Sequence, residues 1–198
     1  MNVNANSVNI KTTKPNYHHG DLRSELVRIG LEHLSRSPSD TLSLREIARE
    51  AGVSATAVYR HFPDKASLVK ALCFEGDAQL AHCFREARDG AGGGKAGFDA
   101  VGRAYVRFAI GNPALFRLMM SSHGLEMRLG TGSLGSDAFG ILIDGISALT
   151  PPEVDGERRR IAALQSWSIV HGLATLMLDG QVPAEESLIE AVIKSHFA

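Results

Sequence analysis

The segment between Leu44 and Lys65 has the residue pattern of two short helices that cross at a sharp angle. Ser43 and Glu46 are spaced as a capping box, which predicts a helix that starts at Leu44. Gly52 ends this helix, because glycine readily adopts the positive φ of a tight turn, and Ala48 is small enough for a close helix approach. The pattern predicts a helix–turn–helix unit whose core positions are Leu44, Ile47, Ala51, Val53, Val58 and Phe62.

The second helix of this unit is predicted to begin after Ser54 and to run through His61. Its outward face carries small side chains near the start and hydrogen-bonding or cationic side chains further along. It comprises Ala55, Thr56, Tyr59, Arg60 and His61. Arg45 and Lys65 flank this helix, at positions where they can hold phosphates on either side. Such a face suits the DNA major groove, so DNA binding is favoured over the alternative of a plain packing unit.

The other regular segments are also predicted to be helical, so the fold class is all-α. A first helix follows Asp21, and a fourth runs from Lys65 towards Arg88, before a glycine-rich break at 90–94. Further helices are expected at about 96–111, 114–122, 136–149, 152–179 and 184–197. Thr150 and Glu153 are spaced as another capping box. No run of alternating β-branched residues is long enough to predict a strand.

The composition is that of a globular chain, with 44% hydrophobic and 22% charged residues. The net charge of −1 divides into +3 for residues 1–71 and −4 for residues 72–198, so the basic part coincides with the predicted helix–turn–helix. Two cysteines do not form a disulfide framework, and residues 1–15 contain no apolar signal segment. These features favour a cytoplasmic location.

No residue pattern predicts catalysis or metal binding. The histidines and cysteines lack metal-ligand spacing, and no serine or cysteine is recognisably placed as a nucleophile, so no enzyme activity, metal or cofactor is expected. Residues 130–135 match Gly-x-Gly-x-x-Gly, but a loop is predicted because no convincing strand precedes them. Residues 161–178 contain no charge, yet their several polar side chains favour a helix between protein surfaces over a membrane span.

Two sets of residues match known family signatures. The first set is Val53-Ser54, Tyr59-Arg60-His61-Phe62 and Lys65; the second is Tyr17–Arg23 together with the Trp-x-x-x-His-Gly motif of Trp167–Gly172. With the first set, the chain resembles the TetR/AcrR family of bacterial transcriptional regulators, and with the second it is similar to one branch of that family. The resemblance implies a flexible arm at 1–16, a helix–turn–helix DNA-binding domain at 17–75, and a helical effector-binding and dimerisation domain at 76–198.

The resemblance also implies roles for the residues of the helix–turn–helix. Tyr59, His61 and Lys65 are expected to contact phosphate, and Ser43 and Arg45 to approach the backbone or a base from the preceding helix. Ala55, Thr56 and Arg60 are expected to contact the DNA bases. Many relatives have Thr where this chain has Ala57, so the operator sequence cannot be carried over.

The C-terminal half is expected to contain an apolar pocket for a small molecule, mainly on the strength of the resemblance, although a solid core has the same composition. The pocket candidates are Phe98, Val101, Tyr105, Phe108, Phe116, Met119, Met120, Trp167 and His171. For His171, a hydrogen-bonded place in the core is favoured over ligand contact. The resemblance further implies that the last two long helices pack against a second copy, through Val170, Leu173, Met177, Leu188 and Val192.

Together these expectations describe a bacterial homodimer that binds a palindromic operator in double-stranded DNA. Repression under the control of an unknown small-molecule effector is the favoured mode of action. The alternative from another class is a small all-α ligand-binding protein or enzyme that uses the C-terminal pocket and whose helix–turn–helix serves only in packing.

Overall fold

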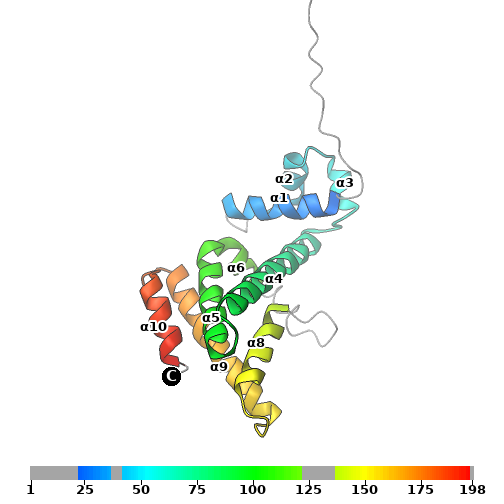
Figure 1. Ribbon diagram of the computed structural model, residues 1–198. Helices are drawn as coiled ribbons and strands as arrows, with labels where there is room; N and C mark the ends of the chain where they lie inside the picture. Colours follow the sequence, from blue (N-terminus) through cyan, green and yellow to red (C-terminus); the bar gives the residue numbers. More distant parts are fainter. Residues whose placement is uncertain (1–21, 37–41, 122–136, 197–198) are drawn as a thin grey trace, which may run out of the picture.

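The computed structural model describes residues 22–36, 42–121 and 137–196, and these residues form helices joined by short connections, with no strand among them (Figure 1). The all-α prediction is confirmed. The helices are α1 (Leu22–Arg36), α2 (Leu44–Glu50), α3 (Ala55–Tyr59), α4 (Lys65–Gly90), α5 (Gly94–Gly111), α6 (Pro113–Met120), α8 (Asp137–Leu149), α9 (Gly156–Leu178) and α10 (Glu186–His196). The predicted arm at 1–16, the 17–21 lead-in and the loop at 130–135 lie outside the described residues.

The helix–turn–helix forms for the local reasons that the sequence suggests. The Ser43 hydroxyl accepts a hydrogen bond from the Glu46 N–H at 3.2 Å and so caps α2. Gly52 has a φ of 66°, and the next N–H, that of Val53, returns to the Ala48 carbonyl at 3.0 Å. The core positions pack as predicted, because Ile47, Val58 and Phe62 are all buried.

The predicted ends of two helices need correction. α3 ends at Tyr59 rather than His61, since the His61 N–H bonds to the Val58 carbonyl in a closing turn. α9 begins at Gly156 rather than 152, because Asp155 and not Thr150 is its cap: the Asp155 carboxylate accepts the Arg158 N–H at 2.9 Å. The Thr150 hydroxyl instead donates to the Ile146 carbonyl at the end of α8.

Helix α4 connects the two halves of the protein (Figure 1). Its N-terminus follows α3 and carries a capping box between Asp64 and Ser67, with the Ser67 N–H donating to the Asp64 carboxylate at 2.7 Å. Its N-terminal part packs against α1, and the helix also contacts α5, α6 and α8. The domain boundary predicted at residue 76 therefore falls inside one continuous helix.

Helices α5, α8 and α9 pack on one another beside α4, and α10 lies against α5. Arg107 of α5 forms an ion pair with Glu186 in the first turn of α10, and the guanidinium holds the pKa of Glu186 below its ordinary range. Gly102 of α5 faces both α9 and α10, because a Cβ there would lie 3.1 Å from Ile193 and 3.5 Å from Val170. The close approach at Gly102 lets α9 and α10 flank the same stretch of α5.

Among the described helices, α9 is long and apolar enough to cross a membrane by length and composition. A third of its apolar 18-residue window is buried inside the protein, which is the behaviour of a helix that packs on one side. Its other side bears the exposed apolar residues Ile161, Leu164 and Leu176.

Candidate DNA-binding face and small-molecule pocket

The predicted DNA-contacting residues lie on the exposed face of α3, in the turn after it and at positions of α2 and α4 that flank it in the sequence. Thr56, Tyr59 and Arg60 point to solvent, with Tyr59 45% exposed, and Ala55, His61, Arg45 and Lys65 are exposed beside them. Ser43 is half-buried, and its hydroxyl oxygen already caps α2. Seven of the eight predicted residues are thus exposed, and Ser43 is half-buried.

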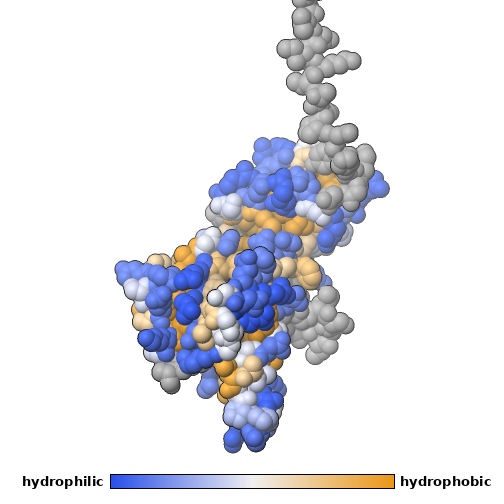
Figure 2. Space-filling view, in the orientation of Figure 1, coloured by the Kyte–Doolittle hydropathy of each residue, from blue (hydrophilic) through white to orange (hydrophobic). Residues whose placement is uncertain are grey.

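Some cations of the N-terminal helices form ion pairs and others do not. On the exposed face, Arg45 and Arg60 form no ion pair with any residue that the structure describes. Away from it, Arg28 pairs with Glu25 and Glu32 on α1, and Arg36 pairs with Glu50 of α2 at 2.9 Å. The surface around α1 and α2 is largely hydrophilic in Figure 2. Positive charge is therefore left available on the face that α3 presents.

A buried histidine ties α2 to α1 behind this face. His33 of α1 lies with its Nδ1 3.0 Å from Oε1 of Glu50, and Arg36 donates to the other oxygen of that carboxylate. The hydrogen bond from His33, followed by the charge of Arg36, lowers the pKa of Glu50 below its ordinary value. Glu50 thereby links α2, which packs against α3, to α1.

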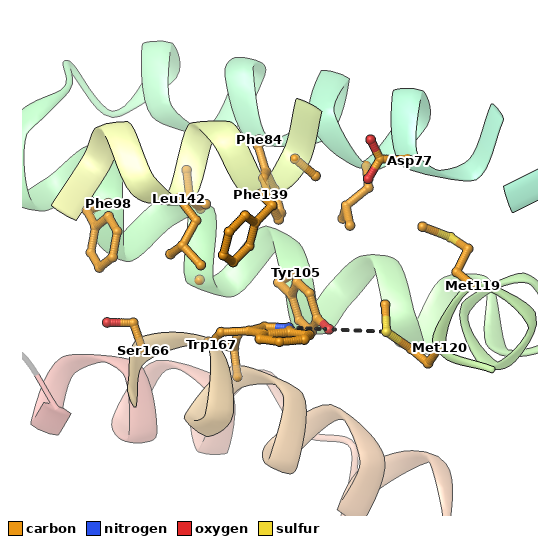
Figure 3. Close-up of a pocket in the computed structure, with 15 residues that line it drawn as sticks. Asp77, Phe84, Phe98, Tyr105, Met119, Met120, Phe139, Leu142, Ser166 and Trp167 are labelled. Atoms are coloured by element: carbon orange, nitrogen blue, oxygen red, sulfur yellow. Dashed lines mark hydrogen bonds between the residues drawn. The ribbon is translucent and has the colours of Figure 1, made fainter. Parts of the chain in front are cut away.

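The second candidate site is a cavity between α4 and α8 on one side and α5, α6 and α9 on the other (Figure 3). About 60 Å³ of it is accessible to the centre of a water-sized molecule, and about 640 Å³ is unoccupied when the opening to solvent is included. Its walls are mostly apolar and aromatic, and they consist of Asp77, Leu80, Phe84, Phe98, Val101, Gly102, Tyr105, Met119, Met120, Ala138, Phe139, Leu142, Ser166, Trp167 and Val170. A cavity of this lining is typical of small-molecule sites.

Six of the nine predicted pocket residues line this cavity: Phe98, Val101, Tyr105, Met119, Met120 and Trp167. Phe108, Phe116 and His171 do not. Phe108 and Phe116 are buried in the main core, and His171 packs against the Phe116 ring with its centroid 5.7 Å away. Val170, predicted at a dimer surface, lines the cavity instead.

The residues that the sequence did not indicate come chiefly from α4 and α8. Asp77, Leu80 and Phe84 enter from α4, which the prediction divided between two domains, and Ala138, Phe139 and Leu142 enter from α8. The i, i+3, i+7 spacing of the α4 residues is the sequence signal for a shared face, but it does not say what that face covers.

The tryptophan and histidine of the Trp-x-x-x-His-Gly motif converge on one hydroxyl. Trp167 Nε1 donates to Tyr105 Oη at 3.2 Å, and the same oxygen lies 2.9 Å from His171 Nδ1. The rings of Tyr105 and Phe116 meet edge to face at 5.6 Å beneath this network. The motif thus joins α9 to Tyr105 of α5. Both Trp167 and Tyr105 form part of the cavity wall.

Asp77 is a charged residue with little exposure in this region, at 8%. Its Oδ2 accepts the backbone N–H of Asp137 at 2.9 Å, at the first residue of α8. The N-terminus of a helix carries partial positive charge and favours a carboxylate. Asp77 therefore anchors α8 to α4 while its side chain lines the cavity.

The residues predicted for a dimer surface lie mostly inside the protein. Val170, Leu173 and Met177 are buried, since this side of α9 packs into the main core against α5. Leu188 and Val192 are half-buried against the same core. The outward side of α9 instead shows Ile161, Leu164 and Leu176, which are 50%, 56% and 40% exposed. Ser168 and Gly172 lie between them, and a Cβ on Gly172 would meet nothing within 4 Å.

Helix α6 lies between the cavity and the N-terminal helices. Met119 and Met120 line the cavity from its last turn, and the helix also packs against α1 and α4. Arg117 connects it to the end of α9, donating to the Asp179 carboxylate at 2.6 Å and to the Leu178 carbonyl at 3.1 Å. Helices α4 and α6 thus contact both the cavity and helix α1 of the N-terminal half.

Comparisons with known proteins agree with both halves. The family described as "Bacterial regulatory proteins, tetR family" matches residues 30–72, and "Tetracyclin repressor-like, C-terminal domain" matches residues 98–196. A Rhodococcus sp. RHA1 protein described as having unknown function is 30% identical, with a TM-score of 0.72 over 92% of this chain and 95% of its own. A tetR-family transcriptional regulator from Streptomyces coelicolor shares the fold at 24% identity and a TM-score of 0.64, over 86% of this chain and 78% of its own.

Proposed function

Since the chain belongs to the TetR family of bacterial regulatory proteins, we propose that this DNA-binding transcriptional regulator is a ligand-responsive repressor that acts in the cytoplasm as a homodimer on a palindromic operator. The observation that supports DNA reading most directly is the exposure of Thr56 on α3 and of Arg60 directly after it, together with the exposed cations Arg45 on α2 and Lys65 on α4. Thr56 and Arg60 read base edges, while Tyr59, His61 and Lys65 hold the phosphate backbone.

The proposed dimer forms through the outward side of α9. Ile161, Leu164 and Leu176 recur at helical spacing along that side, and small residues at 168 and 172 permit a close approach of two helices. Exposed apolar residues in such a row are characteristic of a protein interface. A twofold dimer presents two copies of α3, which in this proposal meet half-sites about 34–36 Å apart on one duplex.

The proposed effector acts through α4. This helix begins beside α3 with Lys65 and lines the cavity further along with Asp77, Leu80 and Phe84. A ligand that favours one position of α4 therefore changes the separation of the two reading helices in the dimer. If the ligand prefers the non-binding conformer about a hundredfold, it weakens operator affinity at saturation by at most about a hundredfold.

DNA selection followed by fluorescence anisotropy tests this function. Duplexes enriched from genomic DNA by the full-length protein should share a palindrome and bind at least about a thousandfold more tightly than scrambled duplexes, with affinity falling as salt rises. Arg45→Ala should weaken binding, and Arg158→Ala, which removes an exposed cation at the start of α9, is the matched control.

The rival function, a ligand carrier or enzyme that uses the C-terminal cavity, predicts the opposite result. Such a protein has no reason to enrich a sequence, so a selection that returns random duplexes would support it and reject the repressor. TetR-family regulators are in general non-enzymatic DNA-binding proteins, which also favours the regulator.

A further inference from the structure

We propose that the effector of this cavity is a small, uncharged and predominantly apolar molecule, and that Phe98 limits the length of molecule that fits. The proposal rests on the proposed function only in calling the ligand an effector. Three features of the cavity support it: the two apolar clusters that line it, its closed ends, and the packing of the Phe98 ring on α8.

The cavity is lined by residues of two separate clusters of buried apolar side chains. Phe98 belongs to the smaller cluster, together with Ile146 of α8 and Ala163 of α9. Other wall residues, such as Val101 and Val170, belong to the main core. An apolar molecule in this space contacts both clusters and removes apolar surface of each from water, which is favourable in proportion to the area buried. Apolar contact should therefore supply most of the affinity.

Both ends of the cavity are closed by buried side chains. Phe98 lies at one end and Met119 at the other, and these residues are 6% and 4% exposed (Figure 3). Among the described residues of the wall, only Phe139 is exposed, at 40%, and it lies between the two ends. A molecule that lies lengthwise in the cavity therefore has both of its ends inside the protein. An ionised group at either end would lose its hydration, which is costly.

The most polar side chains of the wall are bonded to other parts of the protein. Asp77 accepts the Asp137 N–H at 2.9 Å, at the start of α8, where the partial positive charge of the helix N-terminus favours a carboxylate. Ser166 donates its hydroxyl hydrogen to the Ala162 carbonyl at 2.8 Å, one turn back in α9. These two groups thus serve the fold, and the apolar wall is left to bind the ligand.

The cavity is also small. About 60 Å³ of it is accessible to the centre of a water-sized molecule. One water needs roughly 10–15 Å³ on this measure, so the space corresponds to roughly four to six waters. On α5 the wall runs from Phe98 to Tyr105, which is two helical turns or about 10 Å. These dimensions indicate a narrow ligand that is smaller than a typical drug.

The Phe98 ring that closes one end is packed directly on the backbone of α8. A Cβ on Gly145 would lie 2.6 Å from Cδ2 and 3.0 Å from Cε2 of Phe98. Any larger residue at 145 would therefore displace either the ring or the helix. Gly145 thus determines where the ring lies, and the ring determines where the cavity ends.

A series of straight-chain alcohols tests the ligand class and its length. The single tryptophan of the chain lines the cavity, so its fluorescence reports binding to the full-length protein without DNA. Affinity should rise about tenfold with each two carbons added from 1-butanol to 1-hexanol and 1-octanol, and should stop rising at or before 1-decanol. Octanoate and protonated octylamine, which carry opposite charges on a tail of the same length, should bind at least about tenfold more weakly than 1-octanol.

Three results of this series would overturn the proposal. They are binding of either ion as tight as that of 1-octanol, an affinity that does not depend on chain length or still rises at 1-decanol, and no saturable response to 1-octanol up to about 2 mM. Isothermal titration calorimetry on the same compounds confirms that the fluorescence change reports binding.

Two variants should move the length limit in opposite directions. Phe98→Ala removes the end wall and should bind 1-decanol at least about tenfold more tightly than the wild type does, with 1-butanol changed less than about threefold. Gly145→Ala pushes the ring towards the cavity and should weaken 1-octanol binding at least about tenfold, again with little change for 1-butanol. Gly140→Ala makes the same substitution on α8 where a Cβ meets nothing within 4 Å, and Phe74→Ala removes a 55% exposed ring outside the cavity wall. Neither control should change the length limit.

Circular dichroism establishes that each variant is folded. If Phe98→Ala does not fold, Phe98→Leu replaces it and should bind 1-decanol at least about threefold more tightly than the wild type does. A length limit that is the same in the wild type and in the folded Phe98 variant would remove Phe98 as the end wall and overturn the proposal. Unchanged 1-octanol affinity in a folded Gly145→Ala protein would do the same.

Failure of this inference is distinguishable from failure of the proposed function. A protein that prefers octanoate or octylamine and still enriches a palindromic operator would reject only the ligand class. A protein that binds 1-octanol with the expected length limit but enriches no DNA sequence would reject the repressor and leave the ligand class in place. Release of the operator by 1-octanol, and not by octanoate, is the result expected if both are right.

Discussion

Tyr105 Oη of α5 and Trp167 Nε1 of α9 lie 3.2 Å apart, although 62 residues separate them in the sequence. The same hydroxyl pairs with His171 one turn further along α9, at 2.9 Å. Tyr105 also lines the cavity, so one side chain both contacts α9 and forms part of the wall of the proposed effector site. In the proposed function, a ligand that contacts Tyr105 would therefore touch the same side chain that packs against α9.

Tyr105→Phe should destabilise the protein by about 1–3 kcal/mol, because it removes the acceptor of Trp167 and the hydrogen-bond partner of His171 inside the core. Urea unfolding followed by circular dichroism measures the change. Tyr59→Phe deletes the same hydroxyl from an exposed side chain and should change the free energy of unfolding by less than about 0.5 kcal/mol. Equal stability of the two variants would contradict a structural role for the network.

The helix–turn–helix could be predicted because its determinants are local. The Ser43 cap, the Gly52 turn and the buried Val58 all act within a few residues of one another, so spacing in the sequence translates directly into geometry. The exposed face of α3 can then be predicted as well, since the residues of this helix that are not buried in the core must point outward.

The cavity lining and the inward or outward direction of each residue of α9 could be predicted only in part, because they depend on which face of a helix meets which neighbour. Helix α9 has apolar residues on several sides, so its sequence does not indicate that Leu173 turns inward and Leu164 outward. Asp77 was missed because a charged residue on a long helix usually faces solvent, and its partner, the Asp137 N–H, is 60 residues away. Tertiary contacts of this separation leave no local pattern.

Lys65→Ala should weaken binding to operator and scrambled DNA alike. Lys65 is exposed at the first residue of α4, beside α3, where a phosphate contact carries no sequence information. The slope of log affinity against log salt should become shallower by about 1 per half-site. Lys194→Ala, an exposed lysine of α10, serves as the control. A loss confined to operator DNA would assign Lys65 to base reading instead.

Substitutions of Thr56 or Arg60 should change which sequence is selected. Both side chains are exposed on or directly after α3, and each lost base contact is expected to cost about 1–3 kcal/mol of discrimination at one operator position. Repeating the DNA selection with Thr56→Ala and Arg60→Ala measures this directly. An operator consensus identical to that of the wild type would exclude the substituted residue from base reading.

Glu50→Gln should make the protein less stable near neutral pH but not in acid. The pKa of Glu50 is lowered in the folded state, first by the hydrogen bond from His33, so the unfolded chain binds the proton more readily. The carboxylate therefore stabilises the fold above the ordinary Glu pKa, and this contribution disappears as pH falls through the folded-state pKa. Melting temperatures of wild type and variant should differ at about pH 7 and converge near about pH 3.

Glu153→Gln, at an exposed position before α9, is the matched control and should show no such pH-dependent difference. If Glu50→Gln and wild type differ equally at both pH values, the effect comes from packing of the side chain and not from its charge. The variant should also weaken operator binding near neutral pH, since Glu50 sets the position of α2 against α1.

A charge on the outer side of α9 should separate the dimer without unfolding the chain, whereas a charge on its inner side should unfold it. Leu164 is 56% exposed in the row of apolar residues proposed as the dimer surface, and Leu173 is buried, at 7%. Leu164→Glu should sediment as a folded monomer with weaker operator binding, because each half-site contact is then made singly. Leu173→Glu forces a carboxylate into an apolar core, which costs several kcal/mol and should abolish the cooperative melt. Sedimentation velocity and circular dichroism on both variants separate loss of assembly from loss of fold. A Leu164→Glu protein that remains dimeric would move the dimer surface away from this side of α9.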